Sequence, residues 1–147
     1  MKFIADVMVG KLAKRMRLLG FDVLYDHRLK DNEIICIALE QGRIIVTRDT
    51  GLASRPLAQN SILIASNRID EQLHQVLEKA PSPSEAILTR CSACNTPLTA
   101  TVKENIRDQV PNHVIEQHRE FLRCDTCGRI YWKGTHIRNM ERILKLK

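Results

Sequence analysis

Short apolar runs alternate with amphipathic segments through the N-terminal half of the chain, a pattern typical of strands alternating with helices. Residues 3–5 are predicted to form a strand that ends at Asp6, and a helix follows almost at once. At about 100° per residue, one face of this helix is apolar and consists of Met8, Val9, Leu12, Ala13, Met16 and Leu19. The other face is cationic and consists of Lys11, Lys14, Arg15 and Arg17. Gly20 is placed to end the helix.

The same pattern predicts three further strands, at residues 21–25, 43–47 and 61–65. The apolar run 34–41, between the first two of these, has no clean face, which fits either a buried helix or a strand. Asp31 before the run and Gly42 after it favour a helix with a cap at each end. Another helix begins near Arg68. Strands that alternate with helices in this way predict an α/β fold with a parallel sheet and right-handed crossovers.

Acidic residues recur where the predicted strands end. Asp6 ends the first strand and Asp49 follows the third, while Asp31 and Glu33 open the helix between them. Because the carboxyl ends of parallel strands share one edge of a sheet, where the following helices also begin, these acids should converge. Their mutual repulsion favours a divalent cation. Ligation by oxygen alone suits Mg²⁺ or Mn²⁺ and metal-assisted hydrolysis of phosphodiesters.

Each of these residues also has a purely structural explanation. Asp6 and Asp31 can cap the helices that follow them, and Glu33 is a first-turn acid favoured by the helix dipole. The cationic helix face can be solvated surface. Only the convergence of the acids on one edge of the sheet therefore indicates a site. In that case the candidates for holding the phosphate backbone of a nucleic acid are Lys11, Lys14, Arg15 and Arg48.

Two CxxC pairs carry the chemistry of the C-terminal part. Their cysteines are Cys91, Cys94, Cys124 and Cys127. Each pair can present two thiolates to one ion, so the two pairs complete a tetrahedral Cys₄ site for Zn²⁺. Iron in a rubredoxin-like site is the alternative for the same four sulfurs. The metal would be structural, because a module this small lacks a sufficient core and the protein fills every coordination position.

A proline-rich stretch, residues 80–84, divides the chain. The expected domains are an α/β domain over residues 1–86 and, over residues 87–147, a zinc ribbon with a C-terminal helix. The net charge of +6 at pH 7 lies mostly in the second part. Residues 1–88 have twelve Lys or Arg against eleven Asp or Glu, whereas residues 89–147 have eleven against six. The basic C-terminal part suggests an anionic partner such as nucleic acid.

Composition narrows the classes of protein that remain. Hydrophobic residues make up 44% of the chain and charged residues 27%, which fits a globular protein. No stretch approaches the roughly 20 apolar residues of a membrane span, and the N-terminus lacks a signal-peptide pattern. We therefore expect a cytoplasmic protein with no membrane partner and no small-molecule cofactor. A reducing compartment makes disulfides the poorer interpretation of the cysteines.

Three segments of the N-terminal part resemble the Mut-seven C-terminal RNase-domain family, which has a PIN-like nuclease fold. The resemblance covers nearly the whole chain, because that family also carries a C-terminal zinc ribbon. The segments are residues 3–23, 31–49 and 51–55. The resemblance implies a metal-dependent endoribonuclease whose substrate is RNA. Carried over position by position, it places the acidic site on Asp6, Asp31 and Asp49, with Glu33 as a possible addition.

One position departs from the family pattern. Related sequences often have a further Asp two residues after Asp49, where this chain has Gly51. A fourth ligand is then missing or comes from elsewhere, with Asp70 as one choice. Gly51 and the low aromatic content favour an alternative function, a non-catalytic RNA- or ribosome-binding protein. A further alternative is a zinc ribbon that binds another protein, with the acids reduced to helix caps.

Overall fold

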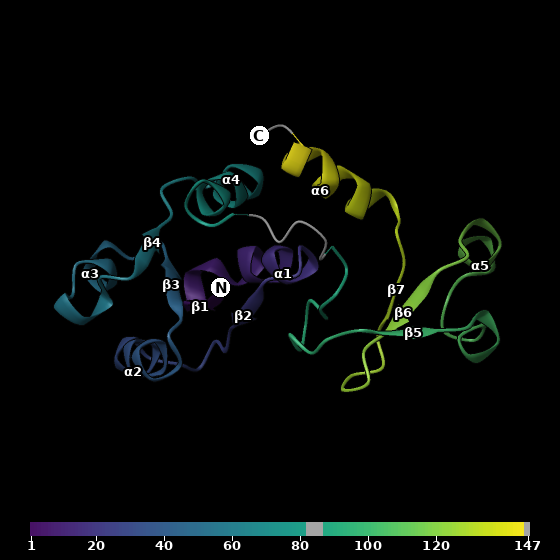
Figure 1. Cartoon of the computed structure of the whole chain (residues 1–147), viewed down its shortest axis with the longest axis horizontal. Coiled ribbons are helices and arrows are strands. Elements are labelled where there is room, and N and C mark those ends of the chain that lie inside the picture. The colour runs from purple at the N-terminus through teal and green to yellow at the C-terminus, as the bar shows by residue number, and fades with distance from the viewer. Residues whose placement is uncertain (82–86, 146–147) are drawn as a thin grey trace.

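A computed structural model describes residues 1–81 and 87–145 of the chain. A four-stranded parallel sheet with helices on both faces forms the N-terminal part, and a three-stranded antiparallel sheet forms the smaller C-terminal part (Figure 1). The first part consists of β1 (Lys2–Ala5), the 3₁₀ turn η1 (Val7–Val9), α1 (Gly10–Leu18), β2 (Asp22–Leu24), α2 (Asp31–Gln41), β3 (Ile44–Thr47), α3 (Thr50–Ala53), the 3₁₀ turn η2 (Pro56–Ala58), β4 (Ser61–Leu63) and α4 (Ile69–Lys79). The second consists of β5 (Thr99–Thr101), the 3₁₀ turn η3 (Lys103–Asn105), α5 (Asn112–Gln117), β6 (Phe121–Arg123), β7 (Ile130–Tyr131) and α6 (Thr135–Lys145).

The parallel sheet has the strand order β2-β1-β3-β4, which confirms the predicted α/β class. Successive strand residues point to opposite faces, so each strand contributes to two cores. In β1, Phe3 lies in the cluster covered by α1 and α4, whereas its neighbour Ile4 lies in the cluster covered by α2 and α3. Since all four strands run the same way, their carboxyl ends form one edge, at which Asp6 follows β1 and Asp49 follows β3.

The start of α1 differs from the sequence prediction. Met8 was predicted to be buried with Val9 and Leu12, but its side chain is 57% exposed. Residues 7–9 form a 3₁₀ turn, and α1 begins only at Gly10. A 3₁₀ turn has about 3.0 residues per turn, so the helical phase that places Leu12 on the core does not extend back to Met8. The rest of the predicted apolar face is buried.

The C-terminal helix α6 returns to the N-terminal part and lies near α4 (Figure 1). Its Ile137 and Met140 are buried in the same cluster as the apolar residues of α1 and α4. The antiparallel sheet has a smaller cluster of its own, in which Phe121 contacts Trp132 with ring centroids 6.4 Å apart. The predicted boundary after residue 86 adjoins residues 82–86, which lie outside the described residues.

Arg17 connects the two parts. It was predicted to lie on the cationic, solvated face of α1, yet it is only 4% exposed. Its guanidinium donates hydrogen bonds of 2.9 Å to the carbonyl oxygens of Val23, Ser92 and Ala93. Ser92 and Ala93 lie between the first two cysteines, so a buried cation of the α/β part holds one turn of the cysteine module.

Replacing Arg17 by leucine should lower the free energy of unfolding by about 3 kcal/mol or more. The change leaves three carbonyl oxygens without their donor, and each buried unsatisfied group costs about 1–3 kcal/mol. Urea unfolding in the presence of zinc measures the difference. Lys14→Leu on the exposed face of the same helix is the matched control and should change stability by less than about 0.5 kcal/mol. Equal effects of the two substitutions would contradict the role of Arg17.

Candidate functional site

The four cysteines of the CxxC pairs come together at one point. The Sγ atoms of Cys91, Cys94, Cys124 and Cys127 all lie within 4.8 Å of one another, and those of Cys91 and Cys127 are 3.7 Å apart. With Zn–S bonds of about 2.3 Å, the edge of an ideal tetrahedron of sulfurs is about 3.8 Å. The spacing of the thiols therefore fits a tetrahedral metal such as zinc.

Two matching turns create this arrangement. In each pair the residue after the second cysteine adopts a left-handed backbone conformation, with φ of 65° at Asn95 and 76° at Gly128. Glycine and asparagine are the residues that tolerate this conformation best. The amide of Asn95 donates to the carbonyl of Cys91, and that of Gly128 to the carbonyl of Cys124, so each turn closes on its first cysteine. Local sequence thus determines both halves of the metal centre.

Tyr131 supports the first turn from β7. Its hydroxyl lies 3.1 Å from Sγ of Cys91 and accepts a hydrogen bond from the amide of Ser92. An aromatic side chain engaged in this way packs the cysteine module, and its hydroxyl is not available to a nucleic acid.

Asp6 is the most buried of the predicted acidic ligands, with 4% of its surface exposed. One carboxylate oxygen accepts from the amide of Met8 at 2.9 Å, and the other accepts from the hydroxyl of Thr47. The same Thr47 oxygen accepts from the amide of Asp49 at 2.9 Å. The pKa of Asp6 is raised above its ordinary value, chiefly by burial. The two hydrogen bonds lower it in part, and the nearby carboxylates of Asp49 and Asp31 add a smaller increase. The carboxylates of Asp31 and Asp49 are therefore close enough to Asp6 to affect its pKa.

Asp49 and Asp31 come from the two helices on the α2–α3 face. Oδ1 of Asp49 caps α3 by accepting from the amides of Gly51 and Leu52, at 2.8 and 3.2 Å. Asp31 is the first residue of α2, not its cap as the sequence suggested, because the cap position is Lys30. Its carboxylate pairs with Arg55 at 3.4 Å.

Glu33 is engaged in capping. Its carboxylate accepts from the amide of Lys30 at 2.8 Å, which satisfies a helix-end donor and accounts for an acid at this position without a metal. Asp70, the one choice for a fourth ligand, is exposed in the first turn of α4. At Gly51 an added Cβ would meet Oδ1 of Asp49 at 3.1 Å, so an acid there would require a small shift of Asp49.

The acids are less tightly gathered than the thiols. Within residues 1–81 and 87–145, the four cysteines are the one group of three or more His, Cys, Asp or Glu side chains placed to share an ion. The carboxylates of Asp31 and Asp49 affect the pKa of Asp6, but the three do not form a second such group. Any ion bound among them would require these side chains to approach one another.

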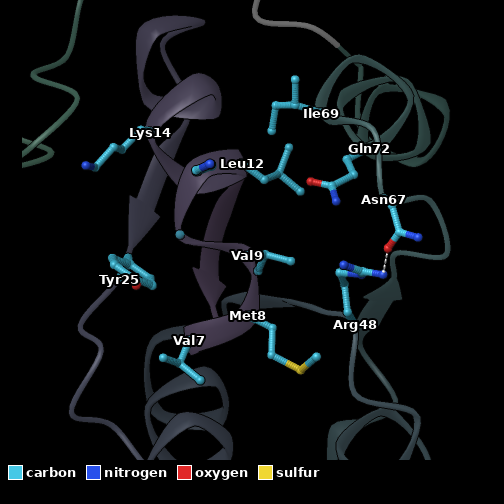
Figure 2. A pocket seen from close by; sticks show the side chains of 12 residues that line it. Val7, Met8, Val9, Leu12, Lys14, Tyr25, Arg48, Asn67, Ile69 and Gln72 are labelled. Carbon is cyan, nitrogen blue, oxygen red and sulfur yellow. Dashed lines mark hydrogen bonds between the residues drawn. The ribbon is translucent and has the colours of Figure 1, made fainter.

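Three of the four predicted cations line one cavity of about 460 Å³ beside the Asp6 turn (Figure 2). Lys11, Lys14 and Arg48 contribute to its wall, whereas Arg15 does not. The guanidinium of Arg48 donates to the side-chain oxygen of Asn67. Sequence reasoning missed Asn67, because the contact joins residues from two separate loops. It also missed Thr47, although a hydroxyl residue immediately before Arg48 and Asp49 is a recognisable signal.

If Mn²⁺ binds at the acidic edge, its affinity should rise with pH through the raised pKa of Asp6. Between the ordinary and the raised pKa, the folded protein keeps a proton on Asp6 that the unfolded chain has lost, so stability without Mn²⁺ falls as pH increases across this window. An ion can bind only after that proton leaves. Calorimetric titrations from about pH 4 to 7 measure the affinity, and Asp6→Asn should remove this part of the pH dependence. A pH-independent affinity for the unaltered protein would contradict the expectation.

The family model described as the Mut7-C RNAse domain matches residues 1–144, nearly the whole chain. The chain matches no curated protein and no solved structure. Among the helices in the described parts of the chain, none is both long and apolar enough to cross a membrane.

Proposed function

Since the chain belongs to the Mut7-C RNase domain family, we propose that it is an endoribonuclease that hydrolyses RNA with Mg²⁺ or Mn²⁺ bound at the acidic edge. The observation that carries the proposal is the buried Asp6 at the carboxyl end of β1, whose pKa is raised by burial and further by the nearby carboxylates of Asp49 and Asp31. Repulsion among buried or partly buried acids is relieved by a divalent cation, for which carboxylate oxygens are preferred ligands.

The chain's own groups then have distinct roles. Asp6, Asp31 and Asp49 would hold the ion, which when bound can activate water and neutralise charge on the phosphate. Thr47 orients Asp6 through its hydroxyl and connects it to the backbone of Asp49. Arg48, the residue between Thr47 and Asp49, is positioned to hold a phosphate of the RNA backbone.

We also propose that the four thiols hold structural zinc and that residues 87–147 form a ribbon domain with its helix, distinct from the nuclease domain of residues 1–86. Four protein ligands leave no open position for a reacting water, so the zinc would take no part in hydrolysis. Metal analysis of the purified protein distinguishes zinc from iron at this site.

Cleavage of RNA by the purified protein tests the proposed activity. We expect protein stripped of loosely held ions to leave a labelled single-stranded RNA intact, and added Mn²⁺ or Mg²⁺ to produce internal cleavage. Thiolate-bound zinc should remain throughout, and metal analysis checks that it does. Cleavage that persists without added ion would contradict the assignment to the acidic edge.

A second candidate function is non-catalytic binding of RNA. Two observations favour it: the three acids do not gather as closely as the thiols, and Gly51 provides no fourth carboxylate. RNA binding without cleavage under any divalent ion would support this alternative. A ribosomal partner belongs to the same alternative, whereas a protein partner bound by the ribbon is the further alternative, in which the acids serve only as helix caps.

A further inference from the structure

The cavity beside Asp6 shares its walls with the acidic edge. The turn η1 that follows Asp6 forms one side, and Arg48, between Thr47 and Asp49, forms another. A ligand in the cavity therefore lies within one or two residues of the chain positions that carry the acids. Figure 2 shows the guanidinium of Arg48 joined to Asn67 by a hydrogen bond, with Val9 on the other side of the cavity. The volume of the cavity is about 460 Å³, within the range of about 300–1,000 Å³ typical of small-molecule sites. This is enough for one nucleotide.

The charge of the cavity is opposite to that of the neighbouring edge. Of the described residues that line it, three are cationic and none is acidic. In the described parts of the chain, none of the salt bridges involves Arg48, and its guanidinium donates to the neutral amide of Asn67. The full positive charge of Arg48 remains available for a phosphate.

The mouth of the cavity is apolar and exposed. Val7 and Met8, which follow Asp6 directly, are 55% and 57% exposed. Two large exposed apolar side chains beside a cationic cavity form a surface that the flat face of a base can cover, and methionine adapts well to such contacts.

Amide groups complete the lining. Asn67 is held by Arg48, and Gln72, 8% exposed, donates its amide nitrogen to the carbonyl of Ser66 at 2.9 Å. Amides held in fixed positions can pair with the polar edges of an unpaired base.

Resting on the proposed ribonuclease function, we infer that this cavity holds one unpaired nucleotide next to the phosphate that is cleaved, with its base on Met8 and its phosphate on Arg48. A base enters such a cavity only after it leaves the stack. The substrate is therefore single-stranded RNA or an unpaired segment, because a duplex keeps its bases stacked and presents only its backbone.

Binding measured without cleavage tests the inference. The Asp6→Asn protein is titrated with a fluorescent single-stranded oligoribonucleotide and with a blunt duplex of the same sequence. We expect the single strand to bind at least about tenfold more tightly, since the duplex gains only backbone contacts. Equal affinities for the two RNAs would overturn the inference.

Two further substitutions on the Asp6→Asn background separate the base contact from the phosphate contact. Met8→Ala should weaken single-strand binding roughly fivefold and leave its salt dependence unchanged, because only apolar contact is lost. Its control is Leu57→Ala, which removes a similarly exposed apolar side chain on η2. Arg48→Gln should weaken binding about tenfold and reduce the slope of log affinity against log salt by about 0.7. Its control is Lys79→Gln at the end of α4. Effects no larger than those of the controls would overturn the inference.

The outcomes distinguish this inference from the proposed function. If the unaltered protein cleaves RNA but Met8→Ala and Arg48→Gln do not weaken single-strand binding, the nucleotide site alone is overturned. If single-strand binding depends on both residues but no divalent ion enables the unaltered protein to cleave RNA, the nucleotide site is supported and the proposed ribonuclease function is contradicted. Failure to bind any RNA overturns both.

Discussion

Replacement of Asp6 by asparagine is expected to reduce divalent-dependent RNA cleavage by at least about 100-fold while the protein remains folded. Loss even of the groups that support metal ligands costs about 10–100-fold, and Asp6 is proposed as a ligand itself. It is also the most buried of the three acids, and its two hydrogen bonds fix its orientation. Rates of cleavage under saturating Mn²⁺ measure the effect.

The substitution is conservative because the hydrogen bonds can survive it. An asparagine oxygen can still accept from the amide of Met8, and its nitrogen can donate to Thr47, whose oxygen has a second lone pair beside the one used by Asp49. Removing a buried negative charge also removes the desolvation cost that chiefly raises the pKa of Asp6, and with it the smaller repulsion from Asp49 and Asp31. We therefore expect thermal stability equal to or above that of the unaltered protein, with full zinc content. Cleavage unaffected by the substitution would show that the activity comes from another site.

Replacement of Cys91 by serine is expected to lose the metal and to loosen the N-terminal sheet as well as the ribbon. Structural zinc contributes about 10–16 kcal/mol of apparent binding free energy in small zinc modules. The turn that holds Cys91 also provides the acceptors for Arg17, and the side chain of Asn95 accepts from the amide of Val23 and donates to Asp22. Loss of the metal should therefore weaken the hydrogen bonds that join this turn to Arg17, Asp22 and Val23.

Hydrogen exchange measures this coupling residue by residue. Protection at the amide of Val23 in β2 should fall in the Cys91→Ser protein, although the substitution lies outside the α/β part. Cys36→Ser is the matched control, because Cys36 is exposed on α2 and outside the cysteine cluster. That variant should keep both its zinc and its protection. Unchanged protection of β2 in the Cys91→Ser protein would mean that the two parts fold independently.

The order of strands and helices could be predicted because it depends on local patterns. Apolar runs gave the strands, and the spacing of the cysteines identified the thiol cluster, since each CxxC turn closes on itself through its own backbone. Arg17 could not be predicted in the same way. A cation at a polar helical position is normally solvated, and its burial here depends on carbonyl groups of residues 92 and 93, far along the chain.

The acidic site was predictable only as far as the shared edge of the sheet. Topology brings Asp6, Asp31 and Asp49 to that edge, but how closely carboxylates approach depends on their local bonds. Asp49 is held by the amides of α3, and Asp31 by Arg55. The exposure of Met8 also escaped prediction, because a single 3₁₀ turn at the start of a helix leaves no clear mark in the spacing of apolar residues.

The return of α6 to the first core has a consequence for how the chain folds during synthesis. Ile137 and Met140 complete the cluster formed by α1 and α4, so that core stays open on one side until residue 140 has left the ribosome. A nascent or prematurely released chain exposes the apolar surface between α1 and α4, which chaperones and proteases recognise. We therefore expect chains that stop before α6 to be prone to aggregation.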